Sequence, residues 1–199
     1  MRSRSKKEYS QLPMSTKVEA TIEDLYKVEG KAELVNGEIV HMSPTGMHPH
    51  YAALRIARSL QDYEMASQGG YAVCDNVGFI VDLPHRTSFS PDAAFYVGED
   101  SEMKFVKGAA VFAVEVRSEG DYGPRAEREI AAKRADYFAA GTLVVWDVDL
   151  LSENVIRVYR ATHPKEAAIY RRGDLAEAEP AVPGWTIAVD DLFRKKPRR

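Results

Sequence analysis

The 199-residue chain lacks several features that define large classes of protein. Its single cysteine, Cys74, cannot form an internal disulfide, which fits a reducing, cytoplasmic setting. No apolar stretch approaches the roughly 20 residues that cross a bilayer. The basic N-terminal residues are not followed by an apolar signal core. We therefore expect a cytoplasmic protein that is not exported and has no membrane partner.

Four catalytic or cofactor-binding patterns are also absent. The sequence contains no Gly-x-x-x-x-Gly-Lys phosphate loop, no Gly-x-Gly-x-x-Gly turn, no Cys/His zinc spacing and no Gly-x-Ser-x-Gly elbow. These absences argue against a nucleoside triphosphatase, a dinucleotide-binding enzyme, a zinc-binding protein and an α/β-hydrolase.

Positive charge is scarce except at the two ends. Residues 1–17 carry five Lys/Arg and one Glu, and residues 194–199 carry five Lys/Arg and no acid. The net charge of −3 therefore leaves −12 for residues 18–193. Such an acidic body argues against broad binding of duplex DNA, because Lys and Arg supply most of that affinity. The basic ends either supply it or are solvated, flexible tails.

The length predicts one domain with a sizeable core, spanning residues 18–193 between the two basic tails. Helices are expected at residues 21–29, 50–67 and 124–140, from capping residues and apolar spacing. Strands are expected at residues 32–35, 38–42, 71–74, 78–81, 92–97, 109–116, 143–148, 155–159, 167–170 and 185–189. Residues 84–87 are predicted as a turn and residues 98–108 as a polar loop.

The apolar run at residues 109–116 has no polar alternation, which is typical of a strand covered on both faces. It ends in Glu115, although burial of a carboxylate is costly without a partner. A metal ion is one such partner, and Arg117 or Lys133 is another. Lys133 and Tyr137 are one turn apart on the helix that follows.

Several other polar residues have two interpretations. Asn36-Gly37 predicts a β-hairpin that either aims Glu33 or Glu38 at a site or leaves them facing solvent. His48 and His50, at the entry of the second helix, either point into a cleft or lie on the surface.

Asp92, Glu115 and Lys133 suit metal-dependent hydrolysis of a phosphodiester. Carboxylates hold a hard cation such as Mg²⁺ while leaving positions open for water and phosphate. A nearby lysine orients the water or neutralises developing charge. We expect the three side chains to converge in one cleft.

The order of these motifs resembles the Uma-type family of restriction endonucleases, a branch of the PD-(D/E)XK nuclease superfamily. The resemblance covers about residues 20–160. It is carried by Glu33-Leu-Val-Asn-Gly-Glu38-Ile-Val-His-Met42-Ser-Pro, His50, Pro91-Asp92, Glu115-Val-Arg-Ser118, Lys133-x-x-x-Tyr137-x-x-x-Gly141 and Trp146-x-x-Asp149.

The resemblance implies a restriction-endonuclease-like α/β fold, with a mixed central sheet flanked by helices and preceded by a helix and a hairpin. It implies metal-ligand roles for Asp92 and Glu115. Arg117 occupies the usual position of the superfamily lysine, so the resemblance transfers that role to Lys133. Glu33 is similar to the family's hairpin acid, a third candidate ligand, and His50 to its helix-entry histidine.

Two features depart from the family pattern. Glu119-Gly120-Asp121 replaces the usual Pro-Ser-Thr after Ser118, and Glu129 replaces an Asp four residues before the lysine. The core ligands remain, whereas the loop over the site differs.

The sequence therefore predicts an endonuclease that uses Mg²⁺ or Mn²⁺ and acts on DNA. The alternative is a non-catalytic DNA-associated or scaffold protein that keeps the nuclease fold. Whether the chain is a monomer or a homodimer stays open.

Overall fold

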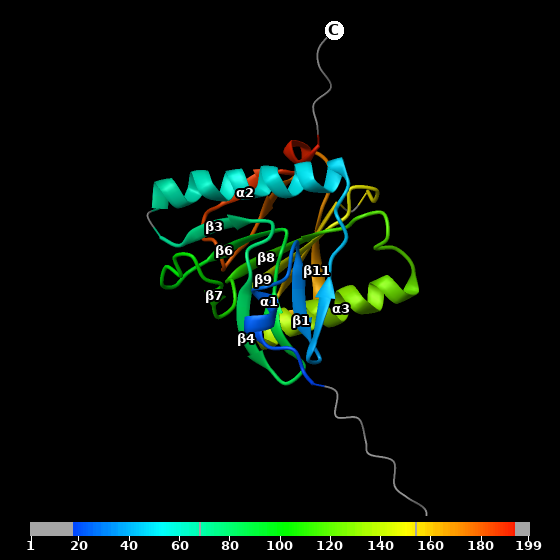
Figure 1. Ribbon diagram of the computed structural model, residues 1–199. Helices are drawn as coiled ribbons and strands as arrows, with labels where there is room; N and C mark the ends of the chain where they lie inside the picture. The colour runs from blue at the N-terminus through cyan, green and yellow to red at the C-terminus, as the bar shows by residue number, and fades with distance from the viewer. Residues whose placement is uncertain (1–17, 68, 154, 194–199) are drawn as a thin grey trace, which may run out of the picture.

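The computed structural model describes residues 18–67, 69–153 and 155–193. The predictions for the basic tails fall on residues outside these ranges. Helix α2 (Met47–Ser67) lies across one side of the molecule, and helix α3 (Pro124–Ala139) lies on the other side of the sheets (Figure 1). Helix α1 (Ile22–Leu25) and the 3-10 helix η1 (Val189–Leu192) are short. None of the helices in these ranges has the length and hydrophobicity to span a bilayer.

Thirteen strands form two larger sheets and one two-stranded sheet within the described residues. The strands are β1 (Ala32–Val35), β2 (Glu38–His41), β3 (Tyr71–Cys74), β4 (Phe79–Leu83), β5 (Arg86–Phe89), β6 (Ala93–Tyr96), β7 (Val106–Lys107), β8 (Phe112–Val116), β9 (Val144–Val148), β10 (Ile156–Arg160), β11 (His163–Tyr170), β12 (Leu175–Glu177) and β13 (Thr186–Ala188).

The six-stranded sheet has the order β11-β10-β9-β8-β6-β3. Its central pair, β8 and β9, is parallel, and α3 connects the two strands. Its other pairs are antiparallel, so the sheet is mixed. The five-stranded sheet has the order β2-β1-β5-β4-β7. The predicted class, mixed sheets with flanking helices after a helix and a hairpin, is confirmed.

Two apolar clusters lie on opposite faces of the six-stranded sheet. One joins α2 to the sheet and the C-terminal segment, and includes Ile56, Val114 and Trp146. The other joins the sheet to the five-stranded sheet and α3, and includes Ala113 and Tyr137. Because neighbouring residues of β8 enter different clusters, the strand is covered on both faces, as its apolar run predicted.

Local signals predicted several elements well. Asn36 and Gly37 have φ of 51° and 68°, the left-handed values that a two-residue hairpin turn requires. Thr21 and Asp24 form the predicted capping box. Helix α3 begins at Pro124, and Gly141 follows its end with a φ of 109°.

The predictions were wrong in five places. The first helix ends at Leu25, and the second begins at Met47, three residues early. The predicted turn at residues 84–87 contains the start of β5, and the predicted loop at residues 98–108 contains β7. No strand was predicted at β12. Strand β5 begins with polar residues, which resemble a turn until their long-range partners are known.

Candidate active site

A row of charged side chains crosses the six-stranded sheet. The strand registers place Glu115 opposite Asp147 and Asp147 opposite Arg157. The registers of β6–β8 and β3–β6, extended by one residue, place Asp92 opposite Glu115 and Asp75 opposite Asp92. Opposite residues share one face of a sheet, so all five lie on the face that packs toward α3. Four of the five are acids, and each needs a cation nearby.

Lys133 supplies the positive charge at Glu115. Its Nζ lies 2.8 Å from Glu115 Oε1 and 2.9 Å from Glu33 Oε1. Burial lowers the pKa of Lys133, but the charges of Glu115 and Glu33 outweigh it and raise the pKa above its usual value. Lys133 is therefore an ammonium ion at neutral pH. The structure therefore brings Lys133 into contact with Glu115, two of the three residues that were expected to converge.

The surroundings of Glu115 disfavour its charged form, whereas those of Glu33 favour the charged form. Burial raises the pKa of Glu115, Lys133 opposes the rise, and the charges of Asp92 and Glu33 add to it. Tyr137 donates a hydrogen bond of 2.5 Å to the same Oε1 that contacts Lys133. Burial and the nearby carboxylate raise the pKa of Tyr137 well above its usual value. Glu115 thus keeps its other oxygen, Oε2, without a donor among the described residues.

Glu33 lies behind Lys133 and is 2% exposed. Its Oε1 also accepts a hydrogen bond from the Ser90 amide (3.0 Å), and its Oε2 accepts one from Arg86. Burial raises the pKa of Glu33, but Lys133 and Arg86 outweigh burial and lower it. Arg86 in turn contacts Asp136 of α3 at 2.8 Å. These contacts leave Glu33 no open position for a metal and instead suit it to hold Lys133.

Asp92 faces Glu115 but is paired with a different lysine. Its Oδ2 accepts a hydrogen bond from the Val116 amide (2.8 Å), and its Oδ1 lies 2.6 Å from Lys31 Nζ. Lys31 also lies 2.9 Å from Asp75 Oδ1. Burial lowers the pKa of Lys31, but Asp92, Asp75 and Glu115 outweigh it and raise the pKa.

Arg117 lies on the same face of the sheet as Glu115, but its side chain contacts other residues. Its Nε and Nη2 each lie 2.7 Å from an oxygen of Asp147. Its Nη1 and Nη2 contact Glu127, and Nη1 also donates to the Asp121 carbonyl at 3.4 Å. The hydrogen bonds to Asp147 help to raise the pKa of Arg117 above its usual value. Its five N–H groups are thus occupied by protein acceptors, and none remains for a phosphate contact.

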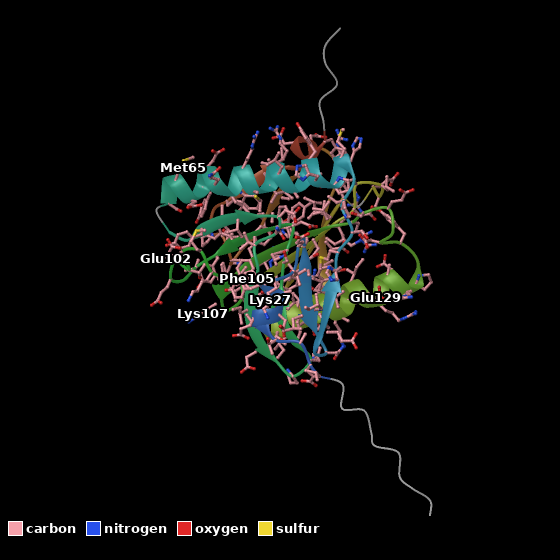
Figure 2. The ribbon with its side chains drawn as sticks, viewed as in Figure 1. Lys27, Met65, Glu102, Phe105, Lys107 and Glu129 are labelled. Carbon is pink, nitrogen blue, oxygen red and sulfur yellow. The ribbon has the colours of Figure 1, made fainter. Side chains whose placement is uncertain are left out.

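His50 lies in the first turn of α2 with an exposed side chain. Its side chain forms no hydrogen bond or ion pair with another described residue, so the structure does not bring the imidazole to the cluster. Glu129 lies on the outer side of α3, where it pairs with Arg125 (Figure 2). Nearer the site, Thr45 and Ser118 hydroxyls lie 2.7 Å apart, which joins the loop before α2 to the segment after β8.

The donor set fits a divalent cation only in part. No three His, Cys, Asp or Glu side chains among the described residues are grouped as a metal site. Asp92 and Glu115 nevertheless present two opposed carboxylates, with side chains 22% and 27% exposed. Mg²⁺ commonly uses one or two carboxylates and completes its shell with water and phosphate. Asp92 and Glu115 therefore fit such an open site and do not form a closed cage.

The sequence did not reveal Lys31, Asp75, Arg86, Asp136 or Asp147 as parts of this network. Lys31 and Asp92 are 61 residues apart, and Arg86 and Glu33 are 53 residues apart. The one usable signal was Asp147, an acid inside an otherwise apolar predicted strand.

Both a family model and a solved structure match this chain. The family model Uma2, described as "Putative restriction endonuclease", matches residues 20–190. A solved structure from Anabaena variabilis, described as a "putative nuclease", superposes with a TM-score of 0.67 at 16% identity. The match covers 87% of this chain and 97% of that one. At this identity the likeness shows the fold alone. No curated protein sequence matches the chain significantly.

Proposed function

This chain belongs to the Uma2 family, and from that membership we propose that it is a metal-dependent endonuclease that hydrolyses DNA phosphodiester bonds. Asp92 and Glu115 would hold Mg²⁺ or Mn²⁺, and Lys133 would act beside them. The observation that carries the proposal is the contact of Lys133 with Glu115, directly opposite Asp92 on the sheet.

The bound cation would lower the pKa of a water molecule and neutralise phosphate charge. The chain's own residues orient the reacting groups. Tyr137 and Lys133 fix Oε1 of Glu115, while the Val116 amide fixes Oδ2 of Asp92. Lys133, held by Glu33, keeps an ammonium ion at the edge of the site, where it can stabilise negative charge that develops on phosphate oxygens.

Lys133 acts through its charge and not as a base. Its raised pKa keeps the proton on Nζ at neutral pH. Glu33 and Arg86 are positioning residues. Glu33 contacts Lys133, Arg86 contacts Glu33, and both lie buried behind the site.

Cleavage of supercoiled plasmid tests the proposal. Full-length protein with Mg²⁺ or Mn²⁺ should convert the plasmid to nicked or linear forms, and chelation should stop the reaction. Asp92→Asn and Lys133→Met should lose the activity. The matched changes Asp62→Asn, on the exposed surface of α2, and Lys27→Met, in the turn just after α1 (Figure 2), should keep it. Equal product from wild type and Asp92→Asn would point to a contaminating nuclease and contradict the proposal.

We expect the basic tails to carry much of the affinity for DNA, because residues 18–193 are strongly acidic. Each phosphate contact steepens the salt dependence by about 0.9 log units per log of salt. A variant without residues 1–17 and 194–199 should therefore bind DNA more weakly with a flatter salt slope. An unchanged slope would assign the contacts to the body of the protein.

One observation favours the alternative, a DNA-associated or scaffold protein without catalysis. Asp92 is already neutralised by Lys31. That reading predicts no cleavage of plasmid, single-stranded or structured DNA with either metal, and the plasmid assay separates the two.

A further inference from the structure

Lys31 places a second ammonium ion among the acids of the site, and its position suggests a role that rests on the proposed function. We propose that Lys31 is an exchangeable counter-cation: it occupies Asp92 in the metal-free protein, releases it to the incoming divalent cation, and is then held by Asp75. Lys31 and Asp75 would thereby set the metal affinity of the site.

The backbone places Lys31 for this contact. Gly30 turns the chain with a φ of 87°, and the Lys31 carbonyl accepts a hydrogen bond of 2.9 Å from the Met42 amide. The residue sits immediately before β1, and its Nζ lies 2.9 Å from Asp75 and 2.6 Å from Asp92. Its side chain is 17% exposed, so it is largely enclosed but still reaches solvent.

Asp92 cannot serve Lys31 and a metal ion equally. One oxygen accepts the Val116 amide and the other lies 2.6 Å from Lys31. Mg²⁺ requires oxygen ligands at about 2.0–2.1 Å. Two cations around one carboxylate oxygen repel each other at such separations, even with strong solvent screening. Binding of the metal through Asp92 therefore requires that the ammonium ion move.

Asp75 provides the place to which it moves. Its Oδ1 already lies 2.9 Å from Lys31, and its side chain is 43% exposed. The Asp75 amide bonds to the Asp92 carbonyl at 3.1 Å, which fixes the two acids as neighbours. Lys31 can lose Asp92 and keep a paired charge. Lys133 needs no such exchange at Glu115, since Glu33 also holds it and Glu115 Oε2 stays open.

Calorimetric titration with Mn²⁺ alone tests the exchange without any measure of activity. Lys31→Met removes the competing charge, so it should bind Mn²⁺ about ten-fold more tightly than wild type. Lys31→Arg keeps the charge and should show no such gain. Lys27→Met removes the same charge from an exposed pair with Asp24 and should change the affinity less than two-fold. A residue that merely supported the fold would weaken binding when removed, so the sign of the change is decisive.

Asp75→Asn gives the opposite prediction. Without Asp75, Lys31 holds Asp92 more firmly, so Mn²⁺ should bind more weakly. The loss should be smaller when Lys31→Met is already present, because only the distant charge of Asp75 then remains to be lost. Equal losses in the two backgrounds would overturn the exchange.

A measurement on the wild-type protein covers the case in which Lys31→Met does not fold. Reductive ¹³C-methylation keeps lysine charged and gives each lysine an NMR signal. The Lys31 signal should shift on addition of diamagnetic Mg²⁺ and should not shift in Asp92→Asn. A Lys31 signal whose chemical shift does not change at saturating metal would contradict the proposal. If Lys31→Met folds and binds Mn²⁺ no more tightly than wild type, the exchange is wrong but the proposed function stands. If neither wild type nor Lys31→Met binds Mn²⁺, the proposed function is wrong as well.

Discussion

The charged row on the six-stranded sheet has two ends that are built differently. At one end, which we call the closed end, Asp147 receives two hydrogen bonds from Arg117, and its side chain is only 4% exposed. At the other, the open end, Asp92 and Glu115 contact lysines and are 22% and 27% exposed. The closed end begins directly beside the open end, because Glu115 and Asp147 are paired across the parallel strands β8 and β9.

The difference shows how one strand pair supports both stability and chemistry. A guanidinium fork that binds a carboxylate through two hydrogen bonds fixes its geometry, so the closed end is suited to joining α3 to the sheet. An ammonium ion is a point charge on a flexible stem and can leave one acceptor for another. The open end is therefore the one where a metal ion or phosphate can enter.

The largest expected effect is on catalysis at the open end. Lys133→Met should slow plasmid cleavage by about 10²–10³-fold, because it removes a charge that stabilises the transition state. Arg117→Lys should leave most of the activity, since Arg117 faces Asp147 and Glu127. An inactive Arg117→Ala that folds normally, beside a fully active Lys133→Met, would reverse the assignment of the two ends.

The next effect is on stability at the closed end. Arg117→Ala should lower the free energy of unfolding by about 3 kcal/mol, because it leaves Asp147 buried without its main partner. The paired change Arg117→Met with Asp147→Leu should recover much of the loss, since it leaves no uncompensated charge. Urea unfolding measures both. A loss below about 1 kcal/mol for Arg117→Ala would show that the closed end does not support the fold.

Glu33, which contacts Lys133 at the open end, should make the free energy of unfolding depend on pH in the acid range. Its pKa is lowered, because Lys133 and Arg86 outweigh the effect of burial. Its stabilising contribution is thus present above the ordinary glutamate pKa of about 4.3 and is lost as pH falls through the lower folded value. Glu33→Gln should cost about 2 kcal/mol at neutral pH and progressively less in acid. Urea unfolding at several pH values measures this, and a difference that does not change with pH would contradict it.

The smallest expected effects come from removing one tyrosine hydroxyl at each end. Tyr137→Phe removes the hydrogen bond to Glu115 but keeps the stacking on Phe89, with ring centroids 4.1 Å apart. It should cost about 1 kcal/mol of stability and reduce cleavage a few-fold. Tyr122→Phe removes a hydrogen bond of 2.9 Å to Asp149 near the closed end and should affect stability alone. Equal effects on cleavage would remove the distinction.

Much of the fold could be predicted because its signals are local. Asn36-Gly37, the Thr21 cap, Pro124 and Gly141 each act within a few residues, and the apolar run before Glu115 marks a central strand. Strand β5 could not be predicted in this way. Arg86 is buried in it only because Glu33 and Asp136 meet it from 53 and 50 residues away.

The site divides in the same manner. Asp92, Glu115 and Lys133 could be selected because each lies at a strand end or on the following helix in a recognisable order. Lys31 precedes an edge hairpin, where a lysine ordinarily faces solvent, and only the tertiary fold brings it to Asp92. Sequence order thus predicts which acids gather, whereas the cation that each acid binds depends on long-range packing.

Calorimetric titration of Mn²⁺ into wild type, Asp92→Asn and Glu127→Gln tests the central claim most directly, that the open end alone binds metal. Asp92→Asn removes a carboxylate charge at the open end, and Glu127→Gln removes one at the closed end. The account predicts binding by wild type and Glu127→Gln and its loss in Asp92→Asn. Equal binding by all three proteins, or loss only in Glu127→Gln, would contradict it.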